Sequence, residues 1–331
     1  LRDYVPNTEK PRITIHADFP ITTSSDGHCP EVSFIPIRWY REYAGNYTTH
    51  TRVSAGELID AVHRMEHLRN EEKENSIYPL VLSFGAKRTS DAQAKSKSTV
   101  KERASRIEKA YKFALHDKVD FEVAMEWLKH YDKNIKDRKE FEGTREAFFE
   151  ALQLAIPALS EIDFDNGEIE AVVSVPGHPS SRHHFSYMSD GLQSMINIVA
   201  EIAHRCIELN GFLGQHAIKM TPGIVMIDEI DLYLHPHWQK HVLQDLTNAF
   251  PMIQFIVSTH SPFIVQSLQE GQLVSFDPNV LTSGEPFREG LEDITSERMG
   301  LQQDIRSRRF NEMVEVASRL FEATDRGSAD R

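Results

Sequence analysis

An α/β fold with a parallel sheet is predicted from three consecutive segments of the sequence. The apolar run 224–227 leads directly into Asp228 and Glu229, as in a buried strand that ends at a polar edge. Apolar residues at helical spacing follow over about 237–250, and a second apolar strand then leads into Ser-Thr-His within 253–260. Such a β-α-β unit makes its two strands parallel, so both strands end on one edge of the sheet, where α/β proteins bind their ligands.

The whole chain is expected to form four segments, one of which contains this unit. They are antiparallel strands with one helix (1–86), a helical insertion (87–160), the lobe that carries the β-α-β unit (161–280) and a helical tail (281–331). The expected strands are 12–17, 31–39, 78–84, 168–175, 182–187 and 271–276, and the expected helices are 58–68, 111–131, 142–159 and 192–207. A hairpin loop is expected at 24–27, and the tail helix is expected to align Phe310, Met313, Val314, Ala317 and Leu320 on one face.

Composition favours an ordinary globular protein. Hydrophobic residues make up 40% and charged residues 26% of the 331 residues, and no apolar run approaches the ~18 residues of a membrane helix, so no membrane is expected. Two cysteines are too few for a disulfide framework, which predicts a reducing, cytoplasmic location.

Charge is unevenly distributed along the chain. The formal net charge is -13, which argues against a surface that attracts nucleic acid everywhere. Residues 87–112 nevertheless carry nine Lys or Arg against three acids. This stretch is either a solvated face or a contact for the phosphate backbone of DNA or for an acidic partner.

The acidic pair and the histidine suggest phosphoanhydride chemistry. Adjacent strand-end side chains point to opposite sides, so Asp228 can hold a hydrated magnesium ion while Glu229 faces a water molecule. The imidazole of His260, at the neighbouring strand end, can contact the transferred phosphate and the attacking water. The acidic pair alone is also explained by a strand that reaches a solvated loop, and a histidine alone at a strand end is also explained by a structural role.

A third candidate element begins the helix expected at 192–207. Ser189, Asp190 and Gly191 precede it, where unpaired N–H groups and the helix dipole attract an anion and glycine permits close backbone approach. The alternative is an ordinary N-cap by the serine or the aspartate.

In this order, the motifs resemble those of ABC-class P-loop ATPases of the RecF and SMC type. More closely, they resemble bacterial AAA-type ATP-binding proteins that include the ATPase of the Septu antiphage system, which works with an HNH nuclease. Residues 188–191 match the signature, 226–229 the Walker B strand, 231–236 the D-loop and His260 the switch histidine. The match is close over about 185–273.

The resemblance implies roles for the site residues and for partners. Glu229 is the implied general base, Asp228 the magnesium ligand, and Asp231 a nucleotide-site residue of the D-loop. The signature turn, 188–191, would contact the γ-phosphate of ATP held by another subunit. ATP and Mg²⁺ are therefore the expected cofactors. A head-to-tail homodimer or higher homo-oligomer and an HNH-type nuclease are the expected partners, with a role in antiphage defence.

One departure from the family pattern leaves alternatives open. No G-x-x-x-x-G-K-[ST] loop occurs in the 331 residues, and we interpret this as a truncated N-terminal segment rather than a true loss. A degenerate ATPase that serves as an inert scaffold is one alternative. A Toprim-type metal-dependent nuclease using Asp228, Glu229 and Asp231 is another, although it needs ~100 residues after His260 and only 71 follow. The pairs His237/His241 and His183/His184 lack the further ligands of a zinc site.

Overall fold

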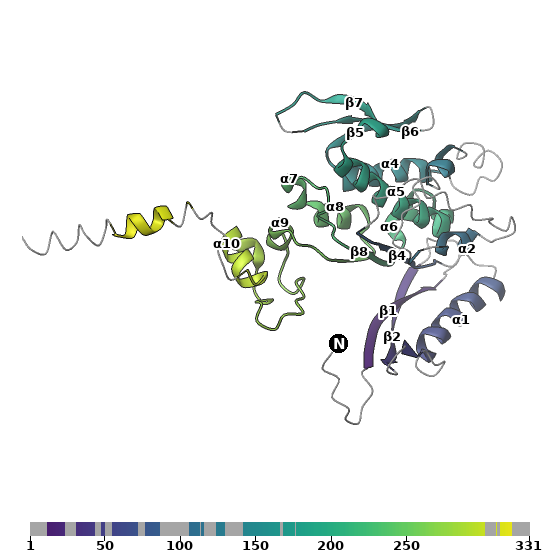
Figure 1. Ribbon diagram of the computed structural model, residues 1–331. Coiled ribbons are helices and arrows are strands. Elements are labelled where there is room, and N and C mark those ends of the chain that lie inside the picture. Colours follow the sequence, from purple (N-terminus) through teal and green to yellow (C-terminus); the bar gives the residue numbers. More distant parts are fainter. Residues whose placement is uncertain are drawn as a thin grey trace, which may run out of the picture. The chain divides into compact units, whose positions relative to one another are not determined.

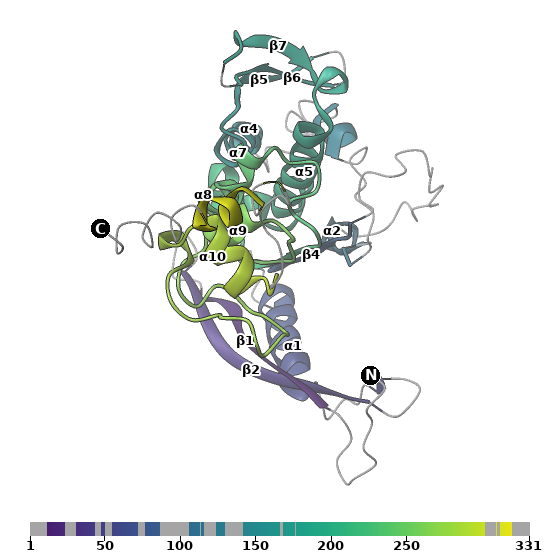
Figure 2. The ribbon, with the colours of Figure 1, turned by 60° about the vertical axis from the view of Figure 1, so that its left-hand side comes forward.

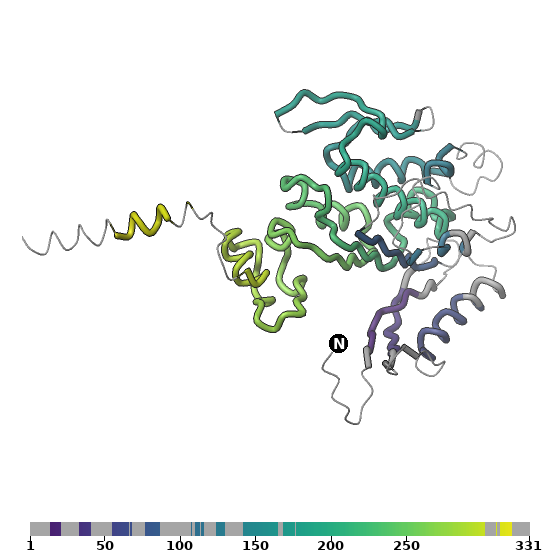
Figure 3. The backbone as a smooth tube through the Cα atoms, viewed as in Figure 1, coloured from purple at the N-terminus to yellow at the C-terminus, as the bar shows by residue number. Residues whose placement is uncertain are grey.

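The computed structural model describes residues 12–23, 31–43, 48–49, 55–71, 77–86, 106–112, 114–115, 124–129, 142–165, 168–175, 177–301, 309 and 312–319 (Figures 1 and 3). The chain divides into two compact units. The first comprises Leu1–Asp228 and Asp245–Val257, and the second comprises Glu229–Gln244 and Ser258–Arg331.

A three-stranded parallel sheet lies in the first unit (Figure 1). Its strands are β4 (Leu80–Phe84), β8 (Gly223–Ile227) and β9 (Ile253–Val257), in the order β4-β8-β9. All pairs are parallel, so the predicted α/β class and the predicted parallel strands are confirmed. The start of β8 requires glycine, because a Cβ at Gly223 would lie 2.3 Å from the carbonyl oxygen of Leu80.

The long helix α5 (Asp190–Asn210) forms the centre of the first unit's core. It packs against α2 (Arg106–Tyr111), α4 (Thr144–Ala155), α6 (Ala217–Met220) and β4, and Figure 2 shows α4 and α5 side by side. The largest fully buried side chains of this core include Phe148, Leu152, Ile196, Ile198, Ile202 and Ile207. The helix predicted around α5 is confirmed.

Helix α4 is shorter than the helix expected over 142–159. It ends at Ala155, and strand β5 (Leu159–Asp165) begins four residues later. The reason is Pro157, which disfavours helical backbone at Ile156 and cannot donate a helical hydrogen bond.

Polar side chains inside the first unit join distant segments. Asn210 exchanges hydrogen bonds with the backbone N–H and C=O of Tyr78, both at 2.8 Å, and donates to Thr221. Arg205 pairs with Glu201 and donates to the carbonyls of Ala110 and Lys112. The described helices of 87–160 thus belong to the first unit's core rather than to a separate body.

Two antiparallel sheets complete the first unit. One consists of β1 (Arg12–Thr23), β2 (Glu31–Tyr43) and β3 (Thr48–Thr49), with α1 (Gly56–Glu71) packed on β1 and β2. The strands expected at 12–17 and 31–39 and the helix expected at 58–68 are confirmed, whereas β3 was not expected. The hairpin loop at 24–27 lies outside the described residues. The other sheet has the order β5-β6-β7, with β6 (Glu168–Val173) central and β7 (Ser181–His184) short. The predicted strand 182–187 ends early, in a 3-10 turn at Phe185–Tyr187.

The helix expected over about 237–250 is divided. It forms α7 (Pro236–Gln239) and α8 (Val242–Ala249), with a turn at Lys240 and His241. Neither proline nor glycine occurs within this stretch, so local propensity does not explain the break. Pro251 follows the end of α8, as predicted.

The second unit contains α7, α9 (Pro262–Gln266), α10 (Leu291–Asp293), a 3-10 turn (Pro286–Arg288) and a π-helical turn (Ile294–Arg298). The strand expected over 271–276 is wrong: these residues form no strand, and Phe276 and Val274 are 102% and 78% exposed. No strand among the described residues lies in position to pair with them, so their apolar side chains do not become part of a sheet. Residues 312–319 are helical and exposed, whereas Phe310 and Leu320 lie outside the described residues.

Candidate functional site

Strands β8 and β9 end side by side. Ile227 pairs with Val257 in the parallel register, so the residues that follow both strands emerge at the same edge of the sheet. The backbone N–H of Asp228 donates to the carbonyl of Phe84 at 2.8 Å, which continues the ladder by one residue. The Asp228 side chain itself is exposed.

Glu229, the next residue, adopts a left-handed backbone conformation. Its φ is +50°, and Tyr233 in the same loop has a φ of +67°. A non-glycine residue in this region costs ~1–2 kcal/mol and persists only where its surroundings hold it. Here the N–H of Glu229 donates to Ser258 Oγ at 2.8 Å, and the N–H of Ile230 donates to the Ser258 carbonyl at 3.1 Å.

Asp231 joins the loop after Glu229 to the segment that contains His260. One carboxylate oxygen, Oδ1, accepts from Thr259 Oγ1 at 2.6 Å and from the N–H of His260 at 3.3 Å. The carboxylate of Asp231, which is predicted to contact nucleotide, therefore accepts hydrogen bonds from its own chain. Its contact with nucleotide stays a prediction. One of these bonds holds the backbone of His260.

Gln239 is a residue that sequence reasoning missed. From the end of α7 its Nε2 donates to the carbonyls of Leu234 at 2.8 Å and Asp231 at 3.4 Å, while its Oε1 accepts from Ser261 Oγ at 2.6 Å. Ser261 is 5% exposed. A glutamine one turn into an expected helix carries no distinguishing signal in a single sequence.

Ser189 caps helix α5. Its Oγ accepts from the N–H of Leu192 at 3.4 Å, which confirms the N-cap interpretation. Ser189 and Asp190 are exposed, whereas Gly191 is buried. Gln193 fixes the preceding backbone by donating to the Met188 carbonyl at 2.9 Å. The turn thus presents two polar side chains at the start of a 21-residue helix, while anion binding by this turn stays a prediction.

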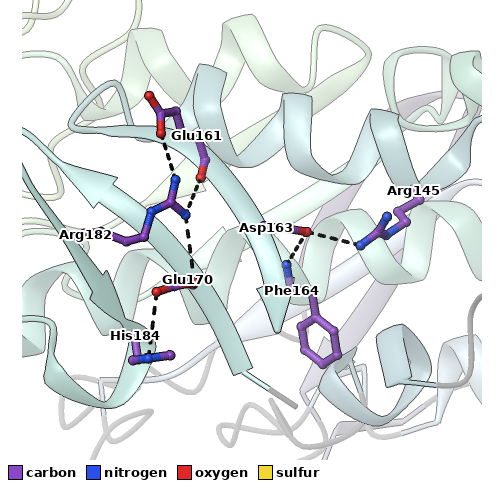
Figure 4. A network of polar contacts seen from close by, with 7 residues as sticks. All are labelled: Arg145, Glu161, Asp163, Phe164, Glu170, Arg182 and His184. Carbon is purple, nitrogen blue, oxygen red and sulfur yellow. Dashed lines mark hydrogen bonds and ion pairs between the residues drawn. The ribbon is translucent and has the colours of Figure 1, made fainter. Parts of the chain in front are cut away.

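A charged network covers one face of the β5-β6-β7 sheet that leads into this turn (Figure 4). Arg182 contacts Glu161 at 2.7 Å and Glu170 at 3.9 Å, and His184 lies 3.8 Å from Glu170. Glu161 stands at a register shift in β5 and has a φ of +47°. Most of these side chains are partly exposed, so each pair contributes little to stability.

A second, separate cluster is formed by Arg145 of α4 and Asp163 of β5 (Figure 4). Arg145 Nη2 lies 3.3 Å from Asp163 Oδ1, which also accepts from the N–H of Phe164 at 2.7 Å. One further bond reaches the 3-10 turn that precedes residues 188–191: Ser186 Oγ donates to Glu168 Oε2 at 2.8 Å. Strand β7 and the turn that follows it are therefore attached to β6 by side chains as well as by the ladder.

Other sequence expectations have a limited structural counterpart. The rings of His237 and His241 lie 5.9 Å apart, and His183 bonds to Ser181, but no group of three possible metal ligands occurs among the described residues. Of the basic stretch 87–112, residues 87–105 lie outside the described ranges. None of the helices in the described part of the chain is both long and apolar enough to cross a membrane.

Comparison with known proteins gives a family and several partial relatives. The model of a family described as AAA domain, putative AbiEii toxin, Type IV TA system matches residues 98–266. The Retron Vc95 probable ATPase of Vibrio cholerae serotype O1 biovar El Tor is 45% identical over 86 residues, covering 26% of this chain and 16% of its own. The Septu protein PtuA of Bacillus mycoides is 36% identical over 115 residues, covering 35% and 15%.

A third relative is the Retron Ec83 probable ATPase of Escherichia coli, 30% identical over 139 residues, covering 42% of this chain and 24% of its own. The chain thus spans between 15% and 24% of the length of these three relatives. Among solved structures, one described as structural biochemistry of ATP-driven dimerization and DNA stimulated activation of SMC ATPases is 22% identical. It has a TM-score of 0.34 and covers 53% of this chain and 98% of that chain. The SMC head domain from Thermotoga maritima is 18% identical, with a TM-score of 0.27 and coverage of 41% and 43%.

Proposed function

The chain belongs to the family described as AAA domain, putative AbiEii toxin, Type IV TA system, and from this premise we propose that it is an ABC-class ATPase that binds and hydrolyses ATP with Mg²⁺. The resemblance predicted from the motifs is confirmed, because the matched relatives are a Septu protein PtuA and probable ATPases of retrons. What this chain does with ATP is our proposal.

The observation that supports the proposal most strongly is the pairing of β8 with β9. Because Ile227 and Val257 are in register, the chain delivers Asp228 and Glu229 from one strand end and Ser258–His260 from the next. An antiparallel arrangement of the two strands would separate the acids from the histidine. Parallel neighbours bring both segments to one edge, as phosphoanhydride hydrolysis requires.

The residues present fit a magnesium ion held together with a nucleotide. Mg²⁺ binds through one or two carboxylates, substrate phosphates and several waters, so it needs no cluster of three protein ligands. The exposed carboxylate of Asp228 meets this requirement. When bound, the metal ion supplies charge neutralisation at the phosphates.

The chain's own groups then have distinct roles. Glu229 is the proposed base that takes a proton from the attacking water, and its left-handed backbone fixes where its carboxylate begins. His260 is proposed to contact the transferred phosphate, with its backbone N–H held by Asp231. Ser189 and Gly191 are proposed to contact the nucleotide of a second copy at the start of α5.

In this proposal, ATP lies between two copies of the chain and contacts both. We propose head-to-tail association on ATP and release on hydrolysis, with the conformational change passed to an HNH-type nuclease partner or to DNA in antiphage defence. Support comes from the Septu and retron relatives and from the exposed side chains of Ser189 and Asp190.

The test uses the protein expressed from its complete coding sequence. We expect Mg²⁺-dependent ATP hydrolysis, its loss by at least ~100-fold in Glu229→Gln, and a long-lived ATP-bound dimer of that variant in size-exclusion chromatography. Asp228→Asn is expected to weaken Mg²⁺-dependent ATP binding itself. Wild-type turnover in Glu229→Gln would rule out its role as the base. ATP binding without turnover in the wild type would instead favour an inert scaffold.

A further inference from the structure

Four hydrogen bonds in the second unit form a closed ring around the residues that follow β8 and β9. The Asp231 carbonyl accepts from Gln239 Nε2 at 3.4 Å, and Gln239 Oε1 accepts from Ser261 Oγ at 2.6 Å. The N–H of Ser261 donates to Thr259 Oγ1 at 3.0 Å, and that hydroxyl donates to Asp231 Oδ1 at 2.6 Å. The ring therefore returns to the residue from which it starts.

The ring joins two segments that are far apart in sequence and that carry the two candidate catalytic groups. Glu229 lies two residues before Asp231, and His260 lies between Thr259 and Ser261. The N–H of His260 also donates to Asp231 Oδ1, which ties it to the ring directly. A displacement of one segment must therefore displace the other or break a hydrogen bond.

Gln239 is the member of the ring that comes from neither segment. Its amide orientation is determined by its neighbours: two carbonyls, those of Leu234 and Asp231, face the amino group, and only a hydroxyl faces the oxygen. Ser261, its partner, is buried and also begins α9 by accepting from the N–H of Phe263 at 3.2 Å. Loss of the bond between Gln239 and Ser261 leaves the Ser261 hydroxyl without this partner in a buried position, which costs free energy.

We propose that Gln239 is a positioning residue of the ATPase, which acts through Asp231 and Ser261 to hold Glu229 and His260 in one fixed geometry. This inference rests on the proposed function. Because a displacement of ~1 Å in a catalytic group can lower a rate ~100-fold, loss of the ring should affect the chemical step rather than ATP binding. The ring adds to the bonds from the N–H groups of Glu229 and Ile230 to Ser258, which hold the strained backbone of Glu229.

The test compares two matched glutamine variants of the protein expressed from its complete coding sequence. Gln239→Met removes the ring while keeping side-chain length, and Gln266→Met removes a comparable bond, that from Gln266 Nε2 to the Glu289 carbonyl at 2.7 Å, elsewhere in the same unit. We expect kcat to fall ~10- to 100-fold in Gln239→Met with KM for ATP within ~2-fold. Gln266→Met should keep kcat within ~2-fold, and Ser261→Ala added to Gln239→Met should lower kcat little further.

Hydrogen exchange without nucleotide gives a second readout that does not depend on turnover. In Gln239→Met, the amides of residues 229–235 and 258–261 should exchange faster together, and in Gln266→Met they should not. Equal losses of kcat in both glutamine variants, or unchanged exchange in Gln239→Met, would overturn the proposal. A wild-type protein without ATPase activity would reject the proposed function, while the exchange data would still decide whether Gln239 couples the two segments.

Discussion

The hydroxyl of Thr259 donates a 2.6 Å hydrogen bond to Asp231 Oδ1, across 28 residues of sequence. This bond fastens the segment after β9 to the loop after β8. Because the acceptor is a carboxylate, the bond is stronger than one between neutral groups. A conservative substitution can remove this bond, because valine has nearly the same shape as threonine but lacks the hydroxyl.

Thr259→Val should therefore destabilise the protein by ~1–2 kcal/mol, because the carboxylate of Asp231 loses a partner in a half-buried place. Thr259→Ser, which keeps the hydroxyl, should cost less than ~1 kcal/mol. Urea denaturation followed by circular dichroism measures both values. A larger cost for Thr259→Ser than for Thr259→Val would show that the methyl group matters more than the hydrogen bond.

Ser189 is predicted to have two roles that different substitutions separate. Ser189→Ala removes the N-cap of α5 and should cost ~0.5–1 kcal/mol, in the lower part of the usual range because the bond to Leu192 is 3.4 Å long. Ser189→Asp keeps a capping oxygen and should retain stability.

The same aspartate places a negative charge where the phosphate of a second copy's nucleotide is proposed to lie. ATP-induced dimerisation of Ser189→Asp should therefore be lost, as measured by light scattering with ATP and Mg²⁺ in a Glu229→Gln background. If Ser189→Asp dimerised at the same ATP concentrations as the protein with serine at this position, the proposed contact of Ser189 with nucleotide would be contradicted.

The backbone of Glu229 makes a prediction that does not depend on its chemistry. At a φ of +50°, glycine avoids the strain that any side chain with a Cβ creates. Glu229→Gly should consequently be more stable than Glu229→Ala by ~1 kcal/mol, the reverse of the order found in helices. Thermal denaturation of the two variants decides this, and a more stable alanine variant would show that the loop relaxes.

Acid sensitivity is predicted at His204, which is 7% exposed within α5. Burial, assisted by the charge of Arg205, lowers the pKa of His204 from 6.5 to about 3. The imidazole is therefore neutral in the folded protein at neutral pH, and its 3.9 Å contact with Glu208 is not an ion pair there.

Between about pH 6.5 and pH 3 the unfolded state binds one more proton at His204 than the folded state. Stability should fall as the pH falls through this range, by up to ~1.4 kcal/mol per pH unit from this residue. His204→Phe, which keeps an aromatic ring near Trp127, should flatten that slope between pH 6 and pH 4.5. An unchanged slope in denaturation experiments would place the acid-sensitive proton elsewhere.

Much of the arrangement could be predicted because its signals are local. The apolar runs of β8 and β9, the polar residues that end them and the helix between them indicate a β-α-β unit from spacing alone. The start of α5 at Asp190 is also predictable, because a serine cap precedes it. Prediction failed, for example, in two places. Residues 271–276 are apolar enough for a strand but pair with none of the described strands, and the helix expected over 142–159 ends early because of Pro157, a local signal that the expectation overlooked.

The sequence alone determined which chemical groups the protein carries and the order in which its strands and helices present them, because apolar periodicity and chain-breaking residues act over a few positions. Only the tertiary structure decided the closed ring through Gln239 and Ser261, the left-handed backbone at Glu229 and the break between α7 and α8. The ring and the backbone of Glu229 depend on hydrogen bonds between residues that lie far apart in the chain. A single side chain's partner is set by the packing of the whole unit, and that information is not contained in its neighbours.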